Sequence, residues 1–386
     1  MRSIGHRPRF LPLPVLSLAA VLGAAQSLLG ICGPFTDVAA DAFCPFVQEI
    51  FYLGITTGTT ATTYDPAGGV TRLQMAAFLS RSVDAVLKRG SRRAALKRFW
   101  TLQNENLLDT TTVGEGPGEP ASDGLDVWVP GFTYGTVSRV RSSDGRLLET
   151  WTGALAPGNA LSAAGKIFIA GHGVPGSLYK IDPREPAGAV TTLASNLGNQ
   201  PQGIAFDGVR IWTANGGNPG PGSISIISPG PSIPWTVTTV MPLPTEATGV
   251  VFDGSNVWAA YLANLLKLDS NGNVLQTVTL VGANPIFDGA NIWVPNYTAS
   301  TVAVVRAASG SILATLTGNG LNGPNQAAFD GERVLVTNSS GSSVSLWKAA
   351  DLSAIGSVPT GAIPIAACSD GVDFWITLVG HEIARF

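Results

Sequence analysis

The sequence predicts a mainly β chain: a seven-bladed β-propeller preceded by a small α-helical module. Three observations predict it. An Asp-Gly turn followed by an apolar strand recurs about every 40 residues, each period holds four strand-like segments, and a segment before the first period looks like a fourth strand. Charged residues make up 13% of the 386-residue chain, and its 46 glycines favour short strands joined by tight turns.

The N-terminus has the pattern of an export signal. Arg2, Arg7 and Arg9 precede an apolar run over residues 11–25, which ends in small residues near a plausible cleavage point. A retained amphipathic anchor and a lipidation site at Cys32 are the alternatives. We therefore expect an extracytoplasmic protein, either secreted or associated with the cell surface or cell wall.

The domain boundaries follow from these patterns. We predict a signal peptide over residues 1–26, a helical module over 33–87, a basic linker over 88–106 and the propeller over 107–386. Residues 107–386 hold 12 Lys/Arg against 20 Asp/Glu, and this acidic balance argues against nucleic acid as a partner. The linker is either a solvated helix end or a contact for anionic wall polymer or lipid.

The helical module is predicted from motifs that stand in a fixed order. They are Phe35-Thr36-Asp37-Val38, an apolar stripe of Phe46, Ile50 and Leu53 at helical spacing, the turn Tyr64-Asp65-Pro66, and a second stripe of Met75, Phe78 and Leu79. Thr71 is placed to cap the second helix. This order resembles a single S-layer homology (SLH) module.

The resemblance implies a binding role for the start of the second helix. In that family such modules hold proteins to cell-wall polysaccharide, and a Thr-Arg-Ala-Glu motif helps to bind the polymer. The matching residues are Thr71, Arg72 and Gln74, with Gln74 in place of the usual acid. The implied partner is cell-wall polysaccharide or peptidoglycan, whose acidic sugars a guanidinium recognises well. A helix pair that only caps or docks is the alternative.

The repeat itself is an Asp-Gly pair ahead of an apolar strand. The copies are Asp123-Gly124, Asp207-Gly208, Asp253-Gly254, Asp288-Gly289, Asp330-Gly331 and Asp370-Gly371, with a worn copy at Ala164-Gly165. Successive glycines lie 41, 43, 46, 35, 42 and 40 residues apart. Four strands in such a period are typical of a propeller blade, and a β-solenoid is the rival fold.

The strands of one period and the chain ends complete the prediction. In the fifth period we expect strands at Ile292–Asn296, Thr301–Arg306 and Ile312–Thr317 after the entry strand. The last period reaches only a third strand, Ile383–Phe386, whereas Leu107–Val113 aligns with fourth strands. We therefore expect Leu107–Val113 to complete the seventh blade, which leaves fewer unpaired edges.

The repeated side chains have two interpretations each. The tryptophans are expected to pack between blades rather than form a ligand-stacking ring: Trp128, Trp212, Trp258, Trp293 and Trp375. The aspartates are either turn residues or a calcium ring. The second strands resemble the YVTN repeat of cell-surface propellers and NHL-type propellers, best at Ile211–Asn215, Ile292–Asn296 and Val334–Asn338.

Candidates for chemistry are few, and we predict no catalytic residue, metal or cofactor. Apart from the signal, histidine occurs at His172 and His381, without a zinc-type spacing, and no Gly-x-Ser-x-Gly motif is present. The possible ligand residues at the propeller mouth are His172 and the asparagines that end equivalent second strands: Asn215, Asn296 and Asn338. Cys32 and Cys44 could pair after export, and Cys368 is expected to be packed.

The function predicted from these features is a non-enzymatic binding or scaffold protein at the cell surface, with an unknown protein or glycan as the propeller's ligand. An exported lyase or hydrolase similar to the virginiamycin B lyase family is one alternative, since such propellers use His and Glu with a divalent metal at one mouth. A self-associating surface-layer component is the other.

Overall fold

The computed structural model describes residues 34–38, 44–52, 55–88, 109–261 and 263–386. The predicted signal peptide, Cys32 and nearly all of the predicted linker lie outside these ranges. The chain divides into two compact units, residues 1–99 and 100–386, which are described separately. Within the described ranges, no helix has the length and apolar character needed to span a membrane.

The described residues of the first unit form two helices, α2 (Cys44–Tyr52) and α3 (Arg72–Lys88), as the sequence predicts. Its core is formed by Phe35, Val38, Cys44 and Val47, with Phe51 and Tyr64 packed against them. The buried face of α2 therefore runs through residues 44, 47 and 51. The predicted stripe at Phe46 was wrong, because Phe46 is 61% exposed.

The start of α3 is stabilised by a reciprocal cap. The Gln74 backbone N–H donates to Thr71 Oγ1 at 3.2 Å, and the Thr71 backbone N–H donates to Gln74 Oε1 at 2.8 Å. This is a capping box, in which the residue at the third helical position is Glu or Gln. Gln74 therefore preserves the helix cap although it removes the negative charge.

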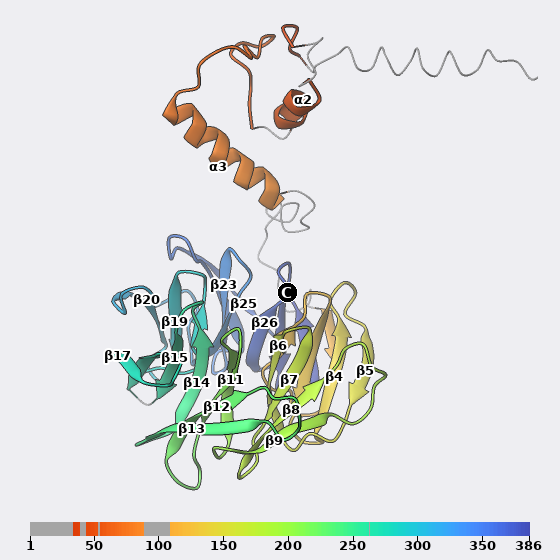
Figure 1. Ribbon diagram of the computed structural model, residues 1–386, viewed down its shortest axis with the longest axis vertical. Helices are drawn as coiled ribbons and strands as arrows, with labels where there is room; N and C mark the ends of the chain where they lie inside the picture. The colour runs from red at the N-terminus through yellow and green to blue at the C-terminus, as the bar shows by residue number, and fades with distance from the viewer. Residues whose placement is uncertain (1–33, 39–43, 53–54, 89–108, 262) are drawn as a thin grey trace, which may run out of the picture. The chain divides into compact units, whose positions relative to one another are not determined.

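The second unit is a ring of seven four-stranded antiparallel sheets, which confirms the predicted propeller (Figure 1). Blade 1 consists of β2 (Ala121–Ser122), β3 (Asp126–Gly131), β4 (Thr136–Arg141) and β5 (Leu147–Trp151). Blade 2 consists of β6 (Pro157–Ala163), β7 (Lys166–Gly171), β8 (Gly176–Ile181) and β9 (Thr191–Leu197). Blade 3 consists of β10 (Pro201–Phe206), β11 (Ile211–Asn215), β12 (Gly222–Ser228) and β13 (Thr236–Leu243). Blade 4 consists of β14 (Ala247–Phe252), β15 (Val257–Tyr261), β16 (Asn264–Leu268) and β17 (Val274–Thr279). Blade 5 consists of β18 (Ile286–Phe287), β19 (Asn291–Asn296), β20 (Thr301–Arg306) and β21 (Ile312–Leu316). Blade 6 consists of β22 (Pro324–Phe329), β23 (Arg333–Asn338), β24 (Ser343–Lys348) and β25 (Ala354–Pro359).

Blade 7 joins the two ends of the propeller. It consists of β26 (Pro364–Ser369), β27 (Phe374–Leu378), β28 (Glu382–Arg385) and the early strand β1 (Asp109–Thr112). Strand β1 pairs with β28 in the antiparallel register Asp109↔Arg385 to Thr112↔Glu382. The predicted closure by residues 107–113 is confirmed for the described part of that segment, where residues 109–112 form the fourth strand of blade 7 and cover the edge of β28.

The Asp-Gly turns also hold the tryptophans between the blades. In blade 5, Asp288 Oδ1 accepts the backbone N–H groups of Ala290 at 2.8 Å and Asn291 at 2.7 Å, while Oδ2 accepts the Trp293 indole N–H at 2.7 Å. The same aspartate–indole bond recurs in the pairs Asp123–Trp128, Asp207–Trp212, Asp253–Trp258 and Asp370–Trp375. All five of these tryptophans are fully buried. The repeated Asp is therefore both a turn residue and the acceptor for a buried indole.

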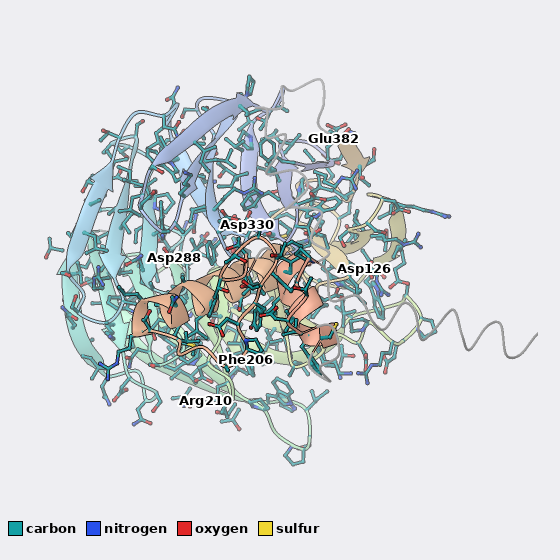
Figure 2. All side chains as sticks on the ribbon, turned by 90° about the horizontal axis from the view of Figure 1, so that it is seen from above. Asp126, Phe206, Arg210, Asp288, Asp330 and Glu382 are labelled. Atoms are coloured by element: carbon teal, nitrogen blue, oxygen red, sulfur yellow. The ribbon has the colours of Figure 1, made fainter. Side chains whose placement is uncertain are left out.

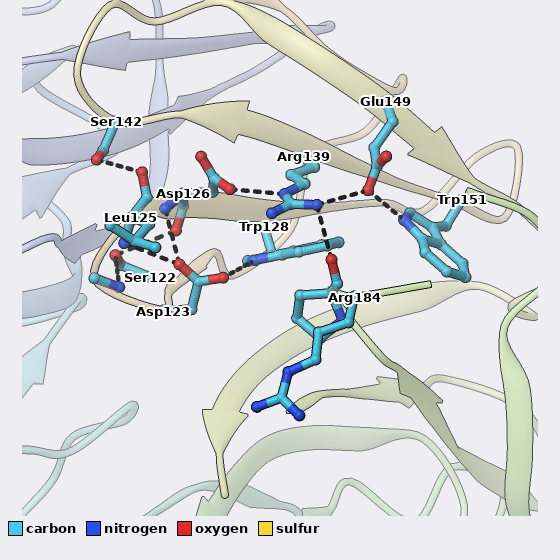
Figure 3. A network of polar contacts seen from close by, with 12 residues as sticks. Ser122, Asp123, Leu125, Asp126, Trp128, Arg139, Ser142, Glu149, Trp151 and Arg184 are labelled. Carbon is cyan, nitrogen blue, oxygen red and sulfur yellow. Dashed lines mark hydrogen bonds and ion pairs between the residues drawn. The ribbon is translucent and has the colours of Figure 1, made fainter. Parts of the chain in front are cut away.

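Blade 1 extends this contact into a longer polar chain (Figure 3). Arg139 donates to Asp126 at 2.7 Å and to Glu149 at 3.1 Å, and its guanidinium lies 5.0 Å from the Trp128 ring centroid. Glu149 also accepts the Trp151 indole N–H. Blade 6 has Leu335 where five of the blades have Trp, and there Asp330 pairs with Arg333 instead, at 2.7 Å. Figure 2 labels Asp288 and Asp330 in these neighbouring blades.

Candidate binding face of the propeller

The two faces of the propeller are built from different connections. We name the strands of a blade A to D from the axis outward; the A strands of neighbouring blades contact one another around the axis. D–A and B–C loops form what we call the front face, and A–B and C–D turns form the back face. The Asp-Gly turns lie on the back face, and the chain enters there too, because Asp109 pairs with Arg385 at the end of β28.

Charge is divided sharply between these faces. Among the described residues, the front-face loops cover 113–120, 132–135, 152–156, 172–175, 198–200, 216–221, 244–246, 263, 280–285, 297–300, 317–323, 339–342, 360–363 and 379–381. By sequence these loops contain no Lys or Arg, whereas they contain Glu115, Glu119 and Glu246. The basic residues of the propeller lie within strands or in back-face turns, where Arg210 and Arg333 pair with the repeated aspartates.

The front face also exposes large apolar side chains. Those in its loops are Phe132, Tyr134, Leu155, Val174, Val281, Tyr297, Ile363 and Val379, each at least 44% exposed. They concentrate beside blades 1 and 2, where the Phe132 ring meets the His172 imidazole edge-on at 5.6 Å between centroids. Aromatic side chains with exposed faces and polar ends are typical of binding surfaces.

The axial channel is nearly closed. Gly203 of β10 and Gly249 of β14 bring backbones so close that a Cβ on Gly203 would lie 2.9 Å from the Gly249 Cα. A Cβ on Gly249 would lie 2.8 Å from Pro285 Cδ. The remaining cavity, lined by Glu119, Asn284 and these glycines, measures about 10 Å³, the volume of about one water. This cavity therefore has room for about one water beside the Glu119 carboxylate.

Glu119 is the titratable group of this channel. Asn159 Nδ2 donates to Glu119 Oε2 at 2.8 Å, and Gln326 contributes a second side-chain hydrogen bond. The surrounding protein removes most of the hydration of the carboxylate, and this desolvation raises the pKa of Glu119 to about 7 although both hydrogen bonds lower it. Residues from blades 1, 2 and 6 thus meet at one ionisable group.

A larger cleft lies between β1 and blade 1. Its volume is about 390 Å³, within the range of small-ligand sites. Its walls include Glu115, Tyr134, Thr136, Leu147 and His381. The Glu115 carboxylate acts on the Tyr134 hydroxyl and raises the pKa of Tyr134. Thr136 Oγ1 is buried and has no hydrogen-bond partner among the described residues.

The two predicted histidines lie on the same face but in different blades. His172 follows β7 in the B–C loop of blade 2 and is half-buried, and burial lowers its pKa. His381 lies exposed in the B–C turn of blade 7, where its backbone carbonyl accepts the Val113 N–H at 2.8 Å. Blade 1 stands between the two blades that carry them.

The predicted asparagines end equivalent B strands, and their amides bind within their own blades. Asn215 is fully buried and donates to Ser223 and Ser225, and Asn338 is fully buried and donates to Ser343 and Ser345. Asn296 is half-buried, and its side-chain oxygen accepts the Ala299 N–H. The structure thus puts the four predicted mouth residues in separate blades, and their contact with a ligand stays a prediction.

The predicted polymer-binding residues lie together at the start of α3. Thr71, Arg72 and Gln74 are all exposed, and Thr71 and Gln74 are joined by the capping box. Asp37 accepts the backbone N–H groups of Tyr64 and Asp65, and these bonds lower its pKa. The hydrogen bonds of Asp37 fix the loop that leads to Arg72.

No three His, Cys, Asp or Glu side chains in the described ranges are grouped so that they could hold a metal ion. Cys368 packs against the core between blades 7 and 1, and burial raises the pKa of its thiol far above the ordinary value. Cys44 lies in the core of the first unit.

Glu115, Glu119 and Tyr134 escaped the sequence interpretation. They could be found by aligning the repeats and then noting, for each charged residue, whether it falls in a front-face loop or in a back-face turn. The segment Gly-Glu-Gly-Pro-Gly-Glu-Pro at residues 114–120 then stands out as an acidic loop on a face that carries no cation in its loops.

Comparison with known proteins supports the two-part architecture. Residues 34–76 match the S-layer homology domain. No curated protein matches the sequence. The chain thus combines an SLH domain with a seven-bladed propeller, and the SLH domain implies association with the cell surface.

Solved structures resemble the propeller. A streptogramin B lyase structure is 14% identical with a TM-score of 0.59, covering 73% of this chain and 99% of that one. Selenomethionine-substituted virginiamycin B lyase from Staphylococcus aureus is 13% identical with a TM-score of 0.60, covering 72% and 98%. The WD40 β-propeller domain of Doa1 is 12% identical with a TM-score of 0.59, covering 74% and 96%. At such identities the likeness shows the fold alone.

Proposed function

We propose that this protein is an exported, cell-surface binding or scaffold protein without enzymatic activity. The SLH domain anchors it to cell-wall polysaccharide or peptidoglycan, and the front face of the propeller binds a ligand. The observation that carries the proposal is the SLH match at residues 34–76 in the same chain as a closed propeller.

Details of the SLH unit support the anchoring role. The capping box holds the start of α3, and the exposed Arg72 stands next to it. A guanidinium there can form two parallel hydrogen bonds to a sugar carboxylate or a phosphate of the wall polymer. Gln74 keeps the cap without adding a negative charge that would repel such a polymer.

Details of the propeller support the binding role. Its first described strand begins at the back face, where Asp109 pairs with Arg385, and the exposed aromatic loops lie on the opposite face of the propeller. The side chains of the back face pair with one another, as in Asp207–Arg210 and Asp330–Arg333. The front-face loops instead expose large apolar side chains to solvent, and such surfaces are typical of sites that bind a partner.

Sedimentation with purified cell walls tests the anchoring role. The full-length Arg72→Gln variant is expected to co-sediment several-fold less than the unchanged protein, because one charge-assisted contact is lost. The matched control is Arg146→Gln, which removes an exposed arginine from the back face of the propeller. If Arg72→Gln sediments as well as that control, the anchoring role is refuted.

A further inference from the structure

The cleft between β1 and blade 1 has a composition that selects one kind of ligand. Glu115 and Tyr134 both line this cleft. The Tyr134 ring is 71% exposed, and Leu147 adds an apolar surface that is 40% exposed. A carboxylate beside an aromatic ring and an aliphatic surface matches a cation at the end of an apolar stem.

The charge of the surrounding face points the same way. The front-face loops contain no Lys or Arg, so nothing in them neutralises Glu115. An anionic ligand would meet repulsion here, whereas a ligand that carries ammonium or guanidinium groups would be attracted to Glu115.

Adjoining groups favour a peptide over a free amine. The backbone links the cleft to the aromatic patch of blades 1 and 2, since the Phe132 N–H donates to the Gly116 carbonyl. Phe132 in turn packs on His172. The surface therefore continues beyond one side chain.

We infer that this cleft binds a peptide segment of a partner protein that carries lysine or arginine, with Glu115 pairing with the cation and Tyr134 covering its stem. The inference names the ligand class of the proposed binding function and rests on it. The Phe132–His172 patch contacts the neighbouring residues of the same segment.

Fluorescence anisotropy with labelled peptides tests the inference on the full-length protein. The probes are hexalysine, hexaglutamate and a neutral Gly-Ser hexapeptide. Hexalysine is expected to bind, and Glu115→Gln and Tyr134→Ala are each expected to weaken it about threefold, with a loss of about tenfold in the double variant. The control Glu185→Gln removes an exposed acid from the back face and leaves the affinity unchanged.

Each result has a clear meaning. Equal losses in Glu115→Gln and Glu185→Gln would indicate unspecific attraction to an acidic protein and overturn the inference, as would binding of the three peptides alike. Tighter binding of hexaglutamate or of the Gly-Ser hexapeptide than of hexalysine would overturn it as well. The double variant keeps Arg72, so it should still co-sediment with cell walls, which separates a failure of this inference from a failure of the anchoring proposal.

Discussion

Ionisation of Glu119 at the propeller axis should set a pH dependence of stability that one substitution removes. The pKa of this carboxyl is raised from 4.5 to about 7 by desolvation. The folded state therefore keeps the proton to higher pH than the unfolded chain does. The free energy of unfolding falls as the pH rises through this window, and the loss is complete above pH 7. At 1.36 kcal/mol per pKa unit, the penalty at pH 8 is about 3 kcal/mol.

Glu119→Gln is the matching perturbation, because glutamine has the shape of the protonated acid and can still accept from Asn159. At pH 4 the variant and the unchanged protein should be nearly equally stable. At pH 8 the variant should be more stable by about 3 kcal/mol, or about 6 °C in Tm. Thermal unfolding followed by tryptophan fluorescence measures this, with Glu185→Gln as the control. A stability difference that is the same at pH 4 and pH 8 would refute the reasoning.

Two further predictions concern the repeat. Asp288→Ala removes the acceptor of two backbone N–H groups and of the buried Trp293 indole, so denaturant unfolding should show a free energy of unfolding that is lower by about 2–4 kcal/mol. A smaller loss is expected for the control Asp269→Ala, because the turn at Asp269 binds no indole. Equal losses in the two variants would contradict the role of the indole bond. Gly249→Ala places a Cβ against Pro285 and should lower the free energy of unfolding by about 1–3 kcal/mol. Gly289→Ala has open space around the new Cβ and should lower it by about 1 kcal/mol, through the strain of its positive φ alone. A larger loss for Gly289→Ala would contradict the close approach of the A strands.

Much of the fold could be predicted because the same short pattern of turn and strand residues recurs in most blades. An Asp followed by Gly specifies a tight turn, and a tryptophan five residues after the Asp both packs between blades and binds that Asp. The strand Thr301–Arg306 was predicted with its observed bounds, and Ile312–Thr317 differs by one residue. Closure followed from counting strands, since three at one end and one at the other complete a sheet.

The SLH helices show where pattern alone is insufficient. The stripe at Phe46 and Ile50 fits helical spacing, yet the buried face of α2 passes through Cys44, Val47 and Phe51. Both stripes are apolar on a nine-residue helix, so spacing does not choose between them. The choice is made by contact with Phe35 and Val38, which are distant in sequence.

The binding face could not be predicted because its residues belong to no repeat. Asn215 and Asn338 drew attention because they recur, and recurrence here reflects a shared structural duty: both amides bind serines of the next strand. Glu115 and Glu119 occur once each, in the loop that joins the closing strand to blade 1. In a propeller each blade must solve the same packing problem, so repeated polar residues are used by the fold. Polar residues that occur in only one blade, such as those on the front face, are not needed for this shared packing. A ligand site should therefore be sought among them.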